Sequence, residues 1–309
     1  MSYKDTTNVR ISLDTLAKSM SLKVLKNAEI YSVGKVPSQG QARLVPCSAM
    51  THLKEALNFD DIVAVVVPPS LAAQVPDNLG IVESATPQQT AYDIHEYLCH
   101  LEGHYWENFE SNIDPTASIH ETAHIASMNV IIGPHTVIEA GTIIKERSLI
   151  GSNCTIGPMA VIGGSAFETR QKDGRQKILL QAGGVKIGDN VVIQSLSNVD
   201  CATFTGFTTI DDETGLDSLI HVAHDCSIGK RVKIAASATI SGRVTIDDDS
   251  YLGPNCTISN GVKIGKDAKV SIGAVVIQDI GPSQTVSGNF AIDHRKWLRF
   301  LSKLKNGKI

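Results

Sequence analysis

Aromatic residues are scarce in this chain, which has 7 Phe, 6 Tyr and 2 Trp among 309 residues. An apolar content of 42% still supports a core, but Ile and Val must supply most of its packing. No apolar run approaches the ~20 residues of a membrane-spanning helix, and no segment resembles a signal peptide. A net charge of −4 gives no electrostatic support for binding nucleic acid. We therefore expect a cytoplasmic protein with no membrane span and no nucleic-acid partner.

Metal ligands and disulfides are also poorly represented. The chain has six cysteines, and in a cytoplasmic protein of this size we expect them to be reduced thiols. His100 and His104 have the i, i+4 spacing of a metal-binding pair, but the segment reads HLEGH and not the HExxH of zinc hydrolases. We expect surface or packing roles for these histidines and for His95, and no metal site.

Aliphatic residues, in contrast, recur with a period of six over much of the chain. This period fits neither the 3.6 residues of a helical turn nor the two-residue alternation of a half-buried strand. The uninterrupted series consists of twelve residues: Ile210, Leu216, Val222, Ile228, Ile234, Ile240, Ile246, Leu252, Ile258, Ile264, Val270 and Val276. The period predicts a parallel β-helix, in which each hexapeptide places one aliphatic side chain inside a three-sided coil.

The period also appears earlier in the chain, where it is interrupted. It begins near Ile113 and continues, with one extra residue, to Ile162; it resumes at Ile187 after a polar stretch. We assign the β-helix to residues 109–281 and expect residues 163–184 to form an insertion loop. Insertions in such solenoids lie on the surface and often carry functional residues.

The N-terminal residues follow a different pattern. Residues 1–108 are expected to form a small α/β domain with its own core. Its predicted elements are a helix at 12–21 with Ser12 as N-cap, a buried strand at 62–68 and a helix at 90–109 that leads into the β-helix.

The C-terminal segment, residues 282–309, is expected to contain a basic amphipathic helix at 293–306. Its apolar face suits packing against the end of the β-helix or against another subunit. Its basic side chains suit docking of an acidic partner, such as a carrier protein or a phosphorylated coenzyme, and the two roles are compatible. The candidate docking residues are Arg295, Lys296, Arg299 and Lys303.

Candidate chemistry must come from side chains that depart from the hexapeptide pattern. Two histidines do so in the segment LIHVAHDCSIG, where His221 and His224 flank the inward-facing Val222. A neutral imidazole at this place can take a proton from an amine or hydroxyl group at cytoplasmic pH. Asp217 and Asp225 are nearby candidates to orient the imidazole.

Gly242 follows His224 by 18 residues, which is one coil of three hexapeptides. We expect Gly242 to lie directly above or below His224, where its backbone N–H would be open to a carbonyl oxygen that becomes an oxyanion. The alternative is that these residues are two solvated histidines and a turn glycine.

The order of these features, with the closing sequence SGNFAIDHRKWLRFLSKLK, resembles the UDP-3-O-(3-hydroxyacyl)glucosamine N-acyltransferases of lipid A synthesis over nearly the whole chain. The resemblance implies a mainly β fold class: a left-handed parallel β-helix between a nucleotide-sugar-binding α/β domain and a C-terminal helix, assembled as a homotrimer. It also implies transfer of an acyl group from acyl carrier protein to a sugar amine, with His224 as general base and Gly242 as oxyanion donor. No bound cofactor is expected, because a thioester is already activated.

Five further positions are candidate substrate-binding residues, and most depart from the family pattern. Phe167 is the one aromatic residue kept where the family has a Gly-Phe-Gly-Phe run. Leu44 and Met50 stand where the family stacks uracil between a Phe and a Tyr. Asp200 is retained in a stretch that loses an arginine, and Asn260 stands near the position of a second family histidine.

These departures favour an N-acyltransferase that acts on another nucleotide-linked amino sugar, for surface polysaccharide or lipopolysaccharide synthesis. The donor is either acyl-CoA or acyl carrier protein, and the acyl chain length, the nucleotide and the sugar are left open. Two alternatives remain: the lipid A enzyme itself, and a non-catalytic hexapeptide scaffold or carbohydrate-binding protein.

Overall fold

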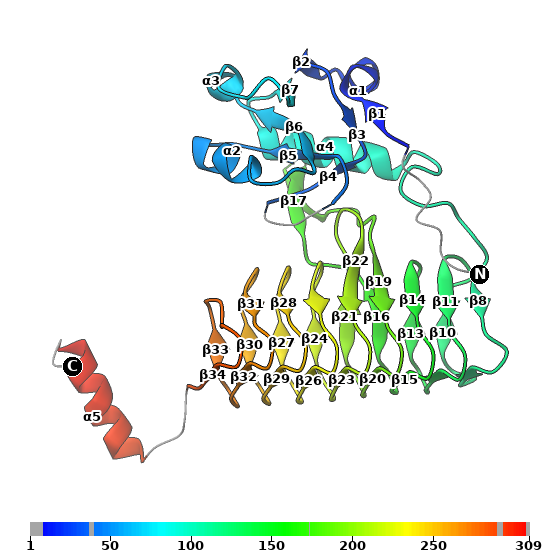
Figure 1. Cartoon of the computed structure of the whole chain (residues 1–309), viewed down its shortest axis with the longest axis vertical. Coiled ribbons are helices and arrows are strands. Elements are labelled where there is room, and N and C mark those ends of the chain that lie inside the picture. Colours follow the sequence, from blue (N-terminus) through cyan, green and yellow to red (C-terminus); the bar gives the residue numbers. More distant parts are fainter. Residues whose placement is uncertain (1–8, 37–39, 173, 289–292, 307–309) are drawn as a thin grey trace.

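Three parallel sheets form the faces of a long prism in the computed structural model, which describes residues 9–36, 40–172, 174–288 and 293–306 (Figure 1). Each coil contributes one short strand to each face, and the next coil adds its strand alongside. His221 pairs with Thr239 and Val222 with Ile240, a register of 18 residues. The predicted parallel β-helix and mainly β fold class are confirmed.

The first face contains β8 (Asn112–Ile113), β11 (Val130–Ile132), β14 (Ser148–Ile150), β19 (Gly184–Ile187), β22 (Phe207–Ile210), β25 (Ser227–Ile228), β28 (Thr245–Ile246) and β31 (Lys263–Ile264). The second face contains β9 (Ser118–Ile119), β12 (Val137–Ile138), β15 (Thr155–Ile156), β20 (Val192–Ile193), β23 (Gly215–Leu216), β26 (Lys233–Ile234), β29 (Tyr251–Leu252), β32 (Lys269–Val270) and β34 (Thr285–Val286). The third face contains β10 (His124–Ile125), β13 (Ile143–Ile144), β16 (Val161–Gly164), β21 (Asn198–Asp200), β24 (His221–Val222), β27 (Thr239–Ile240), β30 (Thr257–Ile258) and β33 (Val275–Val276).

The aliphatic residues of the six-residue period fill the interior of the prism. All twelve of the uninterrupted series belong to one buried cluster, and none is more than 6% exposed. The chain turns at the corners with residues in the left-handed conformation, such as Asp225 at φ +58° and Arg243 at φ +62°. Burying one such side chain per hexapeptide stabilises the coil by roughly 1.5–3 kcal/mol each.

The α/β domain has a five-stranded sheet in the order β2-β7-β6-β5-β4. These strands are β2 (Lys23–Lys26), β4 (Ser32–Val33), β5 (Arg43–Pro46), β6 (Ile62–Val67) and β7 (Gly80–Glu83), and β1 (Ile11–Ser12) pairs separately with β3 (Glu29–Ile30). The helices are α1 (Leu13–Met20), α2 (Met50–Ala56), α3 (Pro69–Ala72) and α4 (Pro87–Cys99).

Two of the three predicted elements of this domain are confirmed. Ser12 Oγ accepts a hydrogen bond from Thr15 N at 3.1 Å and so caps α1, and the predicted strand is β6. The predicted helix at 90–109 is wrong in its extent, because α4 ends at Cys99. The chain then turns through Gly103 at φ +68°, and Trp106 Nε1 donates to Ala182 O at 2.7 Å.

The insertion contains a β-hairpin that rises from the prism to the α/β domain (Figure 1). Its strands are β17 (Thr169–Lys172) and β18 (Arg175–Ile178). Arg170 and Lys172 of β17 form ion pairs with α4: Arg170 Nη2 lies 2.5 Å from Asp93 Oδ1, and Lys172 Nζ lies 2.8 Å from Glu96 Oε2. The stretch predicted as a loop therefore connects the two main parts of the molecule.

The C-terminal helix α5 (His294–Lys305) stands apart from the prism (Figure 1). Asp293 caps it by accepting from Lys296 N at 3.1 Å. Its apolar side chains are 40% to 51% exposed, so the expected packing against the end of the β-helix is not observed. Within the described ranges, α5 and the other helices are all too short or too polar to cross a bilayer.

His95 on α4 gives the first testable prediction, on stability against pH. It is fully buried, Nε2 donates to Leu180 O at 2.9 Å, and Tyr105 Oη lies 3.4 Å from Nδ1. Burial lowers the pKa of His95 to about 4. In the unfolded chain His95 takes up a proton near pH 6.5, whereas in the folded chain it does so only near pH 4. The free energy of unfolding should therefore fall as the pH drops below 6.5. The loss at pH 5 should be ~2 kcal/mol.

The measurement is urea unfolding at pH 7 and pH 5 for the original protein, His95→Gln and, as a control, His52→Gln at an exposed position. The His95→Gln variant should lose most of the pH-dependent difference, while the control keeps it. His104, whose pKa burial also lowers, supplies part of what remains. An equal pH dependence in all three proteins would contradict the assignment.

Candidate active site

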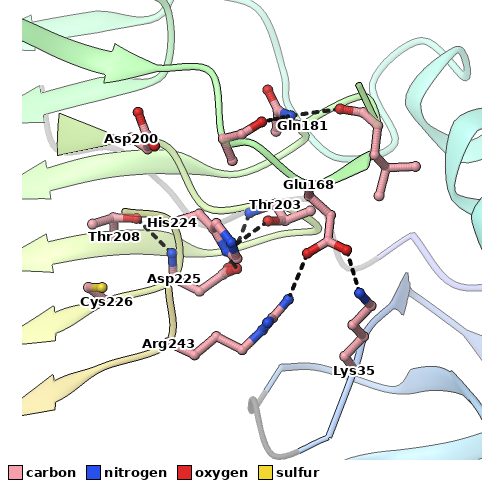
Figure 2. Close-up of polar contacts among 12 residues, drawn as sticks. Lys35, Glu168, Gln181, Asp200, Thr203, Thr208, His224, Asp225, Cys226 and Arg243 are labelled. Atoms are coloured by element: carbon pink, nitrogen blue, oxygen red, sulfur yellow. Dashed lines mark hydrogen bonds and ion pairs between the residues drawn. The ribbon is translucent and has the colours of Figure 1, made fainter. Parts of the chain in front are cut away.

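His224 lies two residues after β24, where the third face of the prism ends at a corner. Its Nδ1 is 2.7 Å from Asp225 Oδ2 and 3.2 Å from Thr203 Oγ1 (Figure 2). Asp225 is itself fixed, because its Oδ1 accepts from Thr203 N and its backbone N donates to Thr208 Oγ1. The Asp225 carboxylate therefore favours a proton on Nδ1 and leaves Nε2 as the basic nitrogen.

Gly242 lies next to His224 on the following coil, as the 18-residue spacing predicted. A Cβ atom on Gly242 would lie 2.7 Å from both Cε1 and Nε2 of His224, so only glycine leaves room for the imidazole in this position. The backbone N–H of Arg243 donates to His224 O at 2.9 Å, and Gly261 N donates to Gly242 O at 3.0 Å. Within the described residues the N–H of Gly242 itself has no hydrogen-bond acceptor, so it remains available to a ligand.

Asn260 continues this column of residues by one more coil. It follows β30 as Gly242 follows β27, and its Oδ1 would lie 3.1 Å from a Cβ atom on Gly242. A basic nitrogen, a backbone donor and an amide side chain thus converge at one corner of the third face. This arrangement suits deprotonation of a nucleophile next to a carbonyl group that gains negative charge.

His221 and Asp200 lie on the preceding part of the same face. His221 Nε2 is 3.8 Å from Asp200 Oδ2, and Asn198 Nδ2 donates to Asp200 Oδ1 at 2.6 Å. Burial raises the pKa of Asp200, against the opposing effect of the Asn198 hydrogen bond and of the positive charge that His221 and His224 can carry. Asp200 is therefore a buried carboxyl group beside both histidines.

The structure places the remaining sequence-predicted residues differently. Leu44 is fully buried in the core of the α/β domain, so its prediction as a substrate-binding residue is wrong. Met50 begins α2 and packs, half-buried, on the apolar cluster below that helix. Asp217 follows β23 on the second face and accepts from Ser218 N at 2.7 Å, and no described contact joins it to either histidine. Phe167 is 81% exposed beside the hairpin.

The sequence reasoning missed an ionic network that contacts this corner from outside the prism (Figure 2). Glu168, at the base of β17, accepts hydrogen bonds from Arg243 Nη2 at 3.1 Å, from Tyr92 Oη at 3.0 Å and from Lys35 Nζ. Burial raises the pKa of Glu168, but the Lys35 hydrogen bond and the charges of Lys35 and Arg243 outweigh it and lower that pKa overall. The only sequence signal for this network is that Arg243 directly follows Gly242.

A cavity of ≈ 470 Å³ lies between the α/β domain and the hairpin. Ser48, Pro68 and Ala85, which follow β5, β6 and β7, form one side of it. The start of α4, including Tyr92, and residues 169–171 of β17 form the rest. The carboxyl ends of parallel strands are the usual place for ligand binding in open α/β sheets.

Comparison with known proteins gives partial matches. Residues 129–164 match the family model "Bacterial transferase hexapeptide (six repeats)", and residues 243–278 match "Hexapeptide repeat of succinyl-transferase". A UDP-3-O-acylglucosamine N-acyltransferase of Caulobacter vibrioides is 46% identical over 152 residues, which are 48% of this chain and 44% of that protein. The protein of the same name from Cytophaga hutchinsonii is 44% identical over 79 residues, 25% of this chain and 22% of its own.

Among solved structures, a UDP-N-acetylglucosamine acyltransferase from Campylobacter jejuni is 23% identical with a TM-score of 0.48, and the match covers 63% of this chain and 83% of that one. The matches to the two curated relatives span less than half of the length of either. Over part of its length, this chain therefore resembles UDP-3-O-acylglucosamine N-acyltransferases and carries the hexapeptide repeats of bacterial transferases.

Proposed function

We propose that this chain is an N-acyltransferase, which moves an acyl group from a thioester donor to the amine of a nucleotide-linked amino sugar. The observation that carries the proposal is the His224–Asp225 pair, with Gly242 of the next coil packed against the His224 imidazole. The partial similarity to UDP-3-O-acylglucosamine N-acyltransferases supports the same reaction class. A purely structural solenoid would have no need for a base and a backbone donor at one corner.

In the proposed reaction, the sugar amine attacks the carbonyl carbon of the thioester while His224 Nε2 accepts a proton from the nitrogen. Asp225 accepts the hydrogen bond from Nδ1 and stabilises the imidazolium that forms. The carbonyl oxygen becomes an oxyanion and accepts a hydrogen bond from Gly242 N–H. The C–S bond then breaks, His224 returns the proton to the leaving sulfur, and an amide and a free thiol remain.

The α/β domain would bind the nucleotide of the acceptor. The cavity at the carboxyl ends of β5, β6 and β7 supports this role, because it is large enough for part of a nucleotide sugar and has polar walls from Ser48, Thr86 and Arg170. The exposed basic residues of α5 would dock the phosphate groups of coenzyme A or the acidic surface of acyl carrier protein. A homotrimer, with sites between neighbouring prisms, belongs to the same proposal.

The proposal predicts which substrate pairs release thiol. Acyl-CoAs and acyl carrier proteins of several chain lengths are tested against UDP- and dTDP-linked amino sugars, with N-acetylated sugars as controls that lack a free amine. Thiol should appear with at least one amino sugar and with none of the controls. Turnover confined to a long hydroxyacyl carrier protein and 3-O-acylated UDP-glucosamine would instead identify the lipid A reaction. Absence of thiol release from every pair would refute the N-acyltransferase.

A further inference from the structure

We infer that Glu168 is a positioning residue that holds the α/β domain in register with the catalytic coil, so that a bound acceptor presents its amine to His224. The inference rests on the proposed function and adds a residue outside the prism to it. Glu168 belongs to the insertion, yet its carboxylate contacts both the α/β domain and the residue directly after Gly242.

The Glu168 carboxylate uses its two oxygens for two different parts of the molecule. Oε1 accepts from Lys35 Nζ and Tyr92 Oη, which belong to the α/β domain. Oε2 accepts from Arg243 Nη2 at 3.1 Å, on the coil that carries Gly242. In the described part of the chain, this is the one ion pair that connects the hairpin to that coil.

The bridge is shielded from solvent, so its geometry is better defined than that of a surface ion pair. The side chains of Glu168, Arg243 and Lys35 are 12%, 13% and 22% exposed. A charged hydrogen bond of this kind is short and directional, and a buried partner left alone loses solvation that the protein does not replace. Glu168 must therefore be paired on both sides for the domain to keep this position.

The two ends of the bridge are the two places where the acceptor is proposed to bind. Tyr92 both lines the 470 Å³ cavity and donates to Glu168, so a ligand in the cavity would lie one side chain from the carboxylate. Arg243 N–H donates to His224 O, so the other end lies one residue from both catalytic groups. A change in the bridge would shift the nucleotide site against the base, and misplacement by about 1 Å can lower a rate roughly 100-fold.

The other ion pairs of the hairpin provide a matched control. Lys172 of β17 pairs with Glu96 of α4 at 2.8 Å and does not contact the catalytic coil. Lys172→Gln removes the ion pairs of Lys172 with Glu96 and Asp93, so it weakens the contact between the insertion and the α/β domain but keeps the Glu168–Arg243 pair. A larger effect of Glu168→Gln on acceptor use would therefore indicate a role at the catalytic coil, which Lys172 does not contact.

The experiment measures kcat and both KM values for Glu168→Gln, Arg243→Gln, the double variant and Lys172→Gln, with the substrate pair found for the original protein. We expect kcat/KM for the acceptor to fall about 10- to 100-fold in Glu168→Gln and Arg243→Gln, with KM for the donor unchanged. The kcat/KM of the double variant should be no lower than that of the less active single variant, because both substitutions remove the same interaction. Lys172→Gln should stay close to the original protein.

Different results separate the failures. If the original protein is active and Glu168→Gln matches Lys172→Gln, the bridge has no positioning role and the inference is wrong, while the proposed function stands. Equal losses for donor and acceptor would also overturn it, since they indicate general damage. If Glu168→Gln does not fold, Lys35→Gln tests the other half of the bridge with the same readout. If the original protein releases no thiol with any substrate pair, the proposed function is wrong, and this inference is wrong with it.

Discussion

Replacing His224 by alanine should lower kcat about 10²- to 10⁴-fold, the range in which a positioned general base contributes. The imidazole of His224 lies against Gly242, and its Nδ1 is fixed by Asp225 at 2.7 Å, which leaves Nε2 as the basic nitrogen. We expect no substitution by His221, because no described contact joins His221 to Asp225 or to Gly242. The measurement is the initial rate of thiol release at saturating donor and acceptor.

The matching control is His135→Ala, which removes an exposed histidine from an earlier coil of the prism. Its rate should equal that of the original protein. Both variants should keep the circular dichroism spectrum of the β-helix, since neither residue belongs to the apolar interior. Near-normal turnover in His224→Ala would exclude this histidine as the base. It would favour the alternative that His221 and His224 are solvated histidines with no catalytic role.

The β-helix could be predicted from the sequence because its stabilising interaction repeats. One aliphatic side chain per hexapeptide must face the interior, so the period of six is visible without any knowledge of long-range contacts. The same regularity placed Gly242 beside His224, because paired strands in neighbouring coils differ by 18 residues. In a regular solenoid, the number of residues in one coil is therefore enough to predict which residues lie next to each other in neighbouring coils.

The insertion and the network of Glu168 could not be predicted in this way. The hairpin of β17 and β18 contains mainly polar residues and has no alternation, since ion pairs with α4 stabilise it and not burial on one face. Glu168 and Lys35 are 133 residues apart, and no periodic rule brings them together. Only the folded α/β domain shows that they meet.

The error at Leu44 has a related cause. Its role was inferred from its place in the resemblance, whereas the structure places it in a core strand. In β5, Arg43, Leu44 and Val45 are all buried, which is typical of a strand covered on both faces of a parallel sheet. The predicted helix at 90–109 failed for a different reason: the chain turns at Gly103, and Trp106 is then held by Ala182 of the insertion, which is distant in sequence.

Gly242→Ala should lower kcat by about 10²- to 10⁴-fold, the contribution of a positioned general base. Alanine keeps the backbone N–H, but its methyl group would lie 2.7 Å from Cε1 and Nε2 of His224, so the imidazole must move away from its position against residue 242. Gly215→Ala is the control: it lies on the second face, and a Cβ atom there meets nothing within 4 Å. Thiol-release rates and melting temperatures of both variants are compared.

Gly242→Ala should melt at a temperature close to that of Gly215→Ala while losing activity, because the steric conflict involves a side chain at the corner and not the apolar interior. Full activity in Gly242→Ala would show that His224 does not act from this position.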